Sequence, residues 1–137
     1  MEITEQLVIF WFRRDFRMED NHGLYRALKS GFPVLPLFIF DRDILDHLGS
    51  EDQRVPFIHQ EIGRLRETCS SAGSPMLVCY GFPEEVFQSL LQQAKIKAIY
   101  TNEDYEPYAL ERDNKVRELC NENGVEFHLY KDHVIFH

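Results

Sequence analysis

Two runs of apolar, β-favouring residues constrain the fold of this chain more than any other feature. Residues 7–12 read LVIFWF and residues 33–41 read PVLPLFIFD. A strand with one face in water alternates apolar and polar residues, whereas a strand covered on both faces is apolar throughout. The two runs therefore predict central strands of a parallel sheet with helices on each side. Pro36 removes one backbone donor from the second run, which predicts a local irregularity there.

Segments with helical spacing separate these runs from three shorter strand-like segments. Strands are predicted at 75–80, 97–101 and 125–130, the last at an edge because its residues alternate. Helices are predicted in the four intervening segments, at residues 21–30, 50–73, 83–94 and 107–124. Asn21 has the side chain of a helix N-cap. Pro56 predicts either a kinked first turn or a regular helix that begins near that residue.

The order of these segments predicts an α/β fold, a doubly wound, Rossmann-like parallel sheet of five strands with helices on both faces. We expect one domain over residues 1–137, with residues 1–6 as a flexible N-terminal tail. Ligands of such sheets bind outside the carboxyl ends of the strands, where the strand order reverses. The loops to examine are therefore 13–20, 41–53, 81–82, 101–106 and 131–137.

The loop after the first strand is dense in charge and reads RRDFRMED. Ion pairs within the loop are one explanation, since matched charges usually pair with one another. The charged side chains concerned are Arg13, Arg14 and Arg17 with Asp15, Glu19 and Asp20. Internal pairing does not account for the flanking aromatic residues Trp11, Phe12 and Phe16. A polar ligand site with aromatic walls is the other explanation, and both stay open at this point.

The composition excludes several classes of protein. With 23 acidic and 15 basic residues and a net charge of −8, the chain repels nucleic-acid backbones unless its charges are sharply segregated. No apolar run approaches the roughly 20 residues of a membrane span, and no secretory signal is visible. Cys69, Cys79 and Cys120 are odd in number and widely spaced, which indicates free thiols in a reducing compartment. We therefore expect a cytoplasmic domain.

Common motifs for nucleotide binding, metal binding and catalysis are missing. Neither G-x-G-x-x-G nor G-x-x-x-x-G-K-[ST] occurs, and Glu84 and Glu85 occupy the helix start where a phosphate would bind after Gly81. The six histidines are scattered, with no cysteine or suitable acid at ligand spacing. We therefore expect no catalytic residue and no metal site. A stand-alone nucleotide-binding regulator is a disfavoured alternative.

Two motifs resemble signatures of the DNA photolyase and cryptochrome family. Residues 10–24, FWFRRDFRMEDNHGL, resemble the opening signature, in which an apolar strand runs into an arginine-rich loop that ends in Asp-Asn. Residues 102–113, NEDYEPYALERD, resemble the second signature of the same domain. The similarity extends in order along the whole chain and includes PLFIFD at 36–41 and QRVPF at 53–57.

The resemblance implies an architecture and a function. Members are blue-light flavoproteins with an N-terminal α/β domain and a larger helical domain, which holds FAD and, in photolyases, damaged DNA. Excited reduced FAD gives an electron to a pyrimidine dimer, and an antenna chromophore in the α/β domain transfers energy to the flavin. This chain resembles the antenna domain of a deoxyribodipyrimidine photolyase alone, inactive because the C-terminal helical FAD domain is absent. The same domain of a cryptochrome photoreceptor is the alternative.

The family also implies which residues hold a chromophore. In members that bind a deazaflavin, the matching positions are Arg14, Arg54, Asp104 and Glu106. This set is physically sensible, because carboxylates accept hydrogen bonds from ring donors and an arginine stacks on a ring or binds an anionic tail. Phe38 and Phe40 belong either to the wall of this site or to the core.

A folate antenna is disfavoured, because folate-binding members carry an Asn-Glu pair where this chain has Tyr108 and Ala109. An empty antenna site also stays open. The partners that the resemblance implies are the helical FAD domain and, through it, damaged DNA. Apolar surface that would face the helical domain predicts that the chain alone self-associates.

Overall fold

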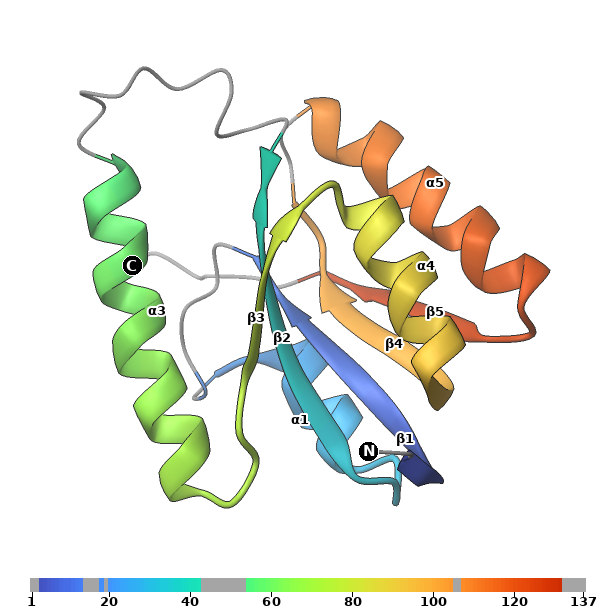
Figure 1. Cartoon of the computed structure of the whole chain (residues 1–137), viewed down its shortest axis with the longest axis horizontal. Coiled ribbons are helices and arrows are strands. Elements are labelled where there is room, and N and C mark those ends of the chain that lie inside the picture. Colours follow the sequence, from blue (N-terminus) through green and yellow to red (C-terminus); the bar gives the residue numbers. More distant parts are fainter. Residues whose placement is uncertain (1–2, 14–17, 19, 43–53, 105–106, 132–137) are drawn as a thin grey trace.

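The computed structural model describes residues 3–13, 18, 20–42, 54–104 and 107–131. These residues form one sheet with helices on both sides (Figure 1). The elements in chain order are β1 (Ile3–Phe12), α1 (His22–Leu28), β2 (Val34–Asp41), α3 (Arg54–Ser71), β3 (Leu77–Gly81), α4 (Pro83–Gln93), β4 (Ala94–Asn102), α5 (Pro107–Glu122) and β5 (Glu126–Tyr130).

The sheet has five strands in the order β3-β2-β1-β4-β5, and all of its neighbouring strands are parallel. The chain builds outward from β1 through β2 to β3, then returns to the other side of β1 for β4 and β5. This arrangement confirms the predicted doubly wound α/β fold and the edge position of the fifth strand. The strand order reverses between β1 and β4, so the carboxyl ends of these two strands mark the expected ligand position.

The alternation of side chains along β1 explains why its sequence is apolar throughout. Val8, Phe10 and Phe12 pack in the core cluster that includes residues of α1 and α3. Ile9 and Trp11 pack on the opposite face, in the cluster that includes residues of α4 and α5. Figure 1 shows α3 on one side of the sheet and α4 and α5 on the other. Both faces of the central strand are therefore dry, as its composition predicted.

β1 and β4 begin earlier than predicted, at Ile3 instead of residue 7 and at Ala94 instead of residue 97. β1 begins at Ile3 and pairs there with Ala94 of β4, before register shifts on either side of Leu7. Residues 3–6 therefore belong to a strand, and the prediction that they form a flexible tail was wrong. The side chains of Glu5 and Gln6 are exposed, so this part of the strand is held by backbone pairing rather than by core packing. A hydrophobic pattern does not reveal pairing of that kind.

The two prolines that complicated the sequence are accommodated without distortion. Pairing of β1 with β2 runs from Val8–Val34 to Phe12–Phe38 with no shift at Pro36, so the predicted irregularity is absent from this ladder. The missing donor coincides instead with the start of the β3 ladder, which begins at Leu37. α3 begins two residues before Pro56, so this proline lies in the first turn, where a helix needs no donor.

Candidate functional site

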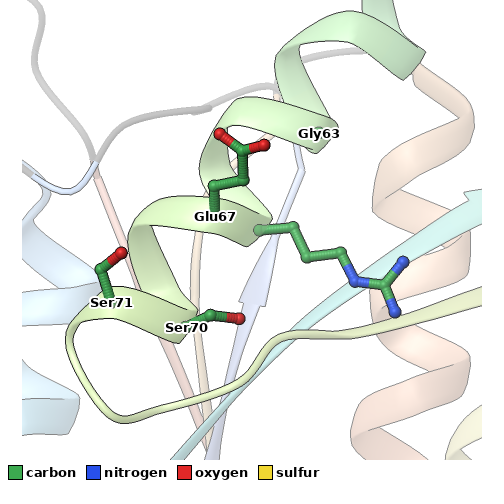
Figure 2. Close-up of a pocket in the computed structure, with 5 residues that line it drawn as sticks. Gly63, Glu67, Ser70 and Ser71 are labelled. Carbon is green, nitrogen blue, oxygen red and sulfur yellow. The ribbon is translucent and has the colours of Figure 1, made fainter.

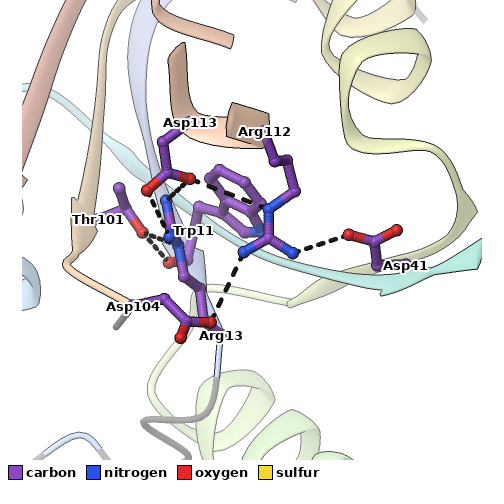
Figure 3. A network of polar contacts seen from close by, with 7 residues as sticks. All are labelled: Trp11, Arg13, Asp41, Thr101, Asp104, Arg112 and Asp113. Atoms are coloured by element: carbon purple, nitrogen blue, oxygen red, sulfur yellow. Dashed lines mark hydrogen bonds and ion pairs between the residues drawn. The ribbon is translucent and has the colours of Figure 1, made fainter. Parts of the chain in front are cut away.

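Charged side chains gather at the carboxyl ends of β1, β2 and β4 (Figure 3). They are two arginines and three aspartates, Arg13, Arg112, Asp41, Asp104 and Asp113. Trp11 and Thr101 lie among them. Trp11, Arg13 and Asp41 come from the ends of β1 and β2, Thr101 and Asp104 from the end of β4, and the remaining two from α5. We call these seven residues the Trp11 cluster. The cluster lies where the strand order reverses.

Arg13 connects β1 to α5. Its Nη1 donates to Asp113 Oδ2 at 2.8 Å, and its Nη2 lies 2.7 Å from Asp113 Oδ1 in an ion pair whose angles do not meet hydrogen-bond geometry. Its Nε donates to Thr101 Oγ1 at 3.0 Å, and Thr101 in turn donates to the Trp11 carbonyl at 2.8 Å. Burial lowers the pKa of the Arg13 guanidinium, and the hydrogen bond to Asp113 opposes that shift. This is a buried, charge-assisted link between residues 100 positions apart.

Arg112 connects α5 to two further segments. Its Nη1 donates to Asp41 Oδ2 at 2.7 Å, at the end of β2. Its Nη2 lies 3.6 Å from Asp104 Oδ2, an ion-pair distance, in the segment after β4. Its guanidinium carbon lies 5.2 Å from the centre of the Trp11 ring and 5.7 Å from that of Tyr108. The guanidinium of Arg13 lies 4.2 Å from the Trp11 ring, so this one indole contacts both cations.

A second polar group lies on the other face of the sheet, between β4 and the start of α1. Asn102 Nδ2 donates to Asn21 Oδ1 at 2.6 Å, and Asn102 Oδ1 accepts from the backbone of Gly23 at 2.8 Å. Asn21 Oδ1 also accepts from the backbone of Leu24 at 3.0 Å, which confirms the predicted N-cap. Two of the backbone donors in the first turn of α1, those of Gly23 and Leu24, are therefore occupied by side chains of the protein.

The structure places only part of the predicted chromophore set. Asp104 is buried and belongs to the Trp11 cluster. Arg54 is the first residue of α3, and its side chain lies outside the described residues. Arg14 and Glu106 also lie outside them. Phe38 and Phe40 are 6% and 3% exposed, so they belong to the core rather than to a site wall.

The sequence analysis missed Asp41, Arg112 and Asp113, and it considered only nearby acids as partners for Arg13. A signal for Asp113 was present, because it shares the buried face of α5 with Ala109, Val116 and Cys120, which all have no exposed surface. An acid at such a position requires a buried partner. The pattern does not say which arginine supplies it.

One carboxylate oxygen beside the cluster has no hydrogen-bond donor among the residues that the structure describes. Glu103 Oε2 is buried and accepts no hydrogen bond from any described residue. Glu103 lies between Asn102, the last residue of β4, and Asp104. Buried acceptors normally have a partner, so this atom indicates where a donor from outside the described residues would bind.

Other parts of the described structure offer less to a ligand. The hollow shown in Figure 2 lies on the second half of α3, and Arg66 and Glu67 place opposite charges on its lining. Among the residues that the structure describes, no group of histidine, cysteine and acidic side chains has the arrangement of a metal site.

No helix in the described ranges is both long and apolar enough to cross a membrane. Burial raises the pKa of the Cys120 thiol to about 11, so it is a poor nucleophile near neutral pH.

Comparison with known proteins relates most of the chain to one family. The family model for DNA photolyase matches residues 8–137. A deoxyribodipyrimidine photo-lyase of Synechococcus sp. is 33% identical over 118 residues, which cover 86% of this chain and 24% of the relative. Cryptochrome-1 of Drosophila melanogaster is 30% identical over 125 residues, which cover 87% of this chain and 23% of the relative.

Solved structures give the same result. An archaeal photolyase from Sulfolobus tokodaii, whose structure contains two FAD molecules, matches with a TM-score of 0.82 and 37% sequence identity. The match covers 95% of this chain and 31% of that protein. This chain therefore spans about a quarter to a third of the length of these relatives.

Proposed function

Because the chain belongs to the DNA photolyase family, we propose that it is the antenna domain of a light-dependent deoxyribodipyrimidine photolyase that repairs UV-induced pyrimidine dimers. In this proposal a separate helical domain binds FAD and damaged DNA, and it is the partner of this domain. We expect no repair activity from the chain alone. The observation that carries the proposal is the Trp11 cluster, which places buried charges where the strand order reverses.

A flavin-type chromophore fits the residues at this position. Its ring N–H and hydroxyl groups need acceptors. Asp104 and Glu103 supply carboxylate oxygens just after β4, and Glu103 Oε2 has no partner within the described part of the chain. Asp104, together with Arg14, Arg54 and Glu106, would hold such a group. When bound, the chromophore would absorb light and pass the excitation energy to the catalytic flavin. The two FAD molecules in the Sulfolobus tokodaii photolyase support a flavin in this role.

A folate is less well supported than a flavin. The position that carries the folate-binding carboxylate in related proteins is Ala109 here, a residue with no exposed surface and no polar side-chain group. Tyr108 is 40% exposed and also lacks a carboxylate. We therefore propose a flavin-type antenna, such as FAD or a deazaflavin.

The proposal assigns no acid, base or nucleophile to this domain. Transfer of excitation energy makes and breaks no bond, so the protein only binds and orients the chromophore. The described side chains do this in a water-poor setting, since Asp41, Asp104 and Asp113 are all at most 9% exposed. Strong charge–dipole contacts at such a position favour one ring orientation.

A cryptochrome photoreceptor is the second candidate, because the relatives include both photolyases and cryptochromes. The two functions differ in what the flavin domain does, so a repair assay on the protein with that domain separates them. Light-dependent splitting of pyrimidine dimers would support the photolyase. A light-induced flavin signal without splitting would support the photoreceptor.

Titration of the chain with FAD in the dark tests the antenna site. We expect saturable binding, followed by flavin fluorescence anisotropy, and weaker binding by about 10- to 100-fold in Asp104→Ala, because a hydrogen bond to a charged group contributes about 1.5–3 kcal/mol. Glu118→Ala, on the exposed side of α5, removes the same charge and should leave the affinity unchanged. No saturable binding, or equal affinities for all three proteins, would contradict the proposal.

A further inference from the structure

Arg112 is the only described side chain that contacts both the end of β2 and the segment after β4 in the Trp11 cluster. Its two Nη atoms contact different carboxylates, Asp41 at 2.7 Å and Asp104 at 3.6 Å. β2 leads to α3 on one face of the sheet, whereas β4 leads to α5 on the other. One guanidinium therefore spans the place where the two layers of helices separate.

The Trp11 ring packs against the Arg112 guanidinium. The indole is 2% exposed, packs edge-to-face against Phe87 with ring centres 5.0 Å apart, and lies 5.2 Å from the Arg112 guanidinium. A flat, immobile ring restricts a planar guanidinium to few orientations. The Arg112 side chain is itself only 12% exposed. Its fork is therefore held on one side by the ring and at its tips by two aspartates.

We propose that Arg112 is a positioning residue of the antenna site. It holds the Asp104 carboxylate in the orientation in which this group accepts a hydrogen bond from the chromophore. This inference rests on the proposed function. Arg112 reaches the chromophore through Asp104, and Asp41 fixes the other half of the fork. A lysine has one ammonium and cannot reproduce a planar fork between two separated carboxylates, so arginine is required here.

The test compares FAD affinities of the chain and four variants. Arg112→Lys keeps the charge and most of the packing volume, and Asp41→Ala removes the second support of the guanidinium without altering Asp104. We expect each to weaken FAD binding by about five-fold or more, as misorientation of one charge-assisted contact requires. Asp104→Ala should weaken FAD binding further. The double variant with Asp104→Ala and Arg112→Lys should bind FAD as well as Asp104→Ala alone, because the two residues act on one contact. Circular dichroism in the far ultraviolet establishes that each variant is folded.

A spectroscopic measurement separates positioning from a general loss of stability. At saturating FAD, Arg112→Lys should change the induced circular dichroism of the bound flavin. If the substitution lowered only the stability of the domain, the flavin bound to the folded fraction would keep the signal of the unaltered chain. Arg117→Lys is the matched control, since Arg117 lies on the same helix, 5.4 Å from the Phe127 ring and outside the cluster. Its affinity and flavin signal should equal those of the unaltered chain.

The outcomes distinguish this inference from the proposed function. If the chain binds FAD and Asp104→Ala weakens binding while Arg112→Lys does not, the antenna site stands and the role of Arg112 is wrong. Additive losses in the double variant would also overturn that role. If the unaltered chain binds no FAD, the proposed function fails, and the inference fails with it.

Discussion

Among the glycines in the described ranges, Gly23 has the least room for a side chain. It lies in the first turn of α1, directly over β4, and its backbone donates to Asn102 Oδ1 at 2.8 Å. A Cβ atom at this position would lie 2.7 Å from that oxygen and 2.9 Å from Phe10 Cε1. The glycine is therefore needed for close approach, because any larger residue displaces the helix from the sheet.

Gly23→Ala should lower the free energy of unfolding by about 1–3 kcal/mol, the usual cost of forcing extra volume into a packed site. Gly63→Ala is the matched control, because a Cβ at Gly63 of α3 meets nothing within 4 Å. That change should instead stabilise the helix by about 0.5–1 kcal/mol. Urea unfolding followed by circular dichroism measures both. Equal effects of the two substitutions would mean that the contact at Gly23 relaxes without cost.

Single residues also set the limit of what the sequence predicts about the site. Asp104 was predicted from the family resemblance, because it matches one of the acids that follow the fourth strand in members that bind a deazaflavin. Arg112 and Asp113 lie inside a helix, and their partners Asp41 and Arg13 are 71 and 100 positions away. Helical periodicity shows that a charge falls on a buried face, but long-range pairing depends on strand order. The sequence therefore did not predict the ion pairs of the Trp11 cluster, which only the three-dimensional structure shows.

At the scale of elements, α5 is attached to the sheet by charge as well as by apolar packing. The Arg13–Asp113 pair joins the end of β1 to the second turn of this helix, with both side chains at most 5% exposed. Breaking one member of such a pair is more harmful than replacing both, because the remaining charge stays buried.

Asp113→Asn should therefore lower the free energy of unfolding by about 3–5 kcal/mol, whereas Arg13→Met combined with Asp113→Leu should lose clearly less. Glu111→Gln is a suitable control, since Glu111 forms an exposed ion pair with Lys115 at 3.8 Å on the same helix and should cost less than about 1 kcal/mol. Urea midpoints of the four proteins report the differences. A double variant less stable than Asp113→Asn would show that the pair itself stabilises the fold.

Element type and order followed from the sequence because burial and capping are local signals. The apolar runs located β1 and β2, and Asn21 located the start of α1. The early starts of β1 and β4 were missed, since the pairing of Ile3 with Ala94 involves a part of β1 whose next side chains, Glu5 and Gln6, are exposed. Backbone pairing between segments far apart in the sequence leaves no periodic pattern of apolar residues.

The whole molecule presents apolar side chains on several surfaces. Tyr25 and Leu28 on α1, Tyr80 on the edge strand β3 and Leu110 on α5 are each 55–62% exposed. The chain spans about a quarter to a third of the length of the two photolyases compared above, and the proposed function includes a helical domain that would cover such surfaces. Exposed apolar groups of this size favour association when no partner covers them.

We therefore expect the chain alone to self-associate, with a sedimentation coefficient that rises with protein concentration. Leu28→Lys should reduce this rise, because Leu28 is 60% exposed and a charge there opposes burial. Gln88→Lys, which adds the same charge at an exposed position of α4, should leave it unchanged. A concentration-independent monomer would contradict the expectation.

The strand order has a consequence for how the chain acquires its structure during synthesis. β1 is translated first, yet it is the central strand and needs β4 as a neighbour on one side. Roughly 80 residues separate Phe12 from Ala94, so at about 5–20 residues per second the ribosome adds β4 roughly 4–16 s after β1. Over that interval LVIFWF has one unpaired edge. The central strand of the sheet is thus open to aggregation along one edge until β4 has been made.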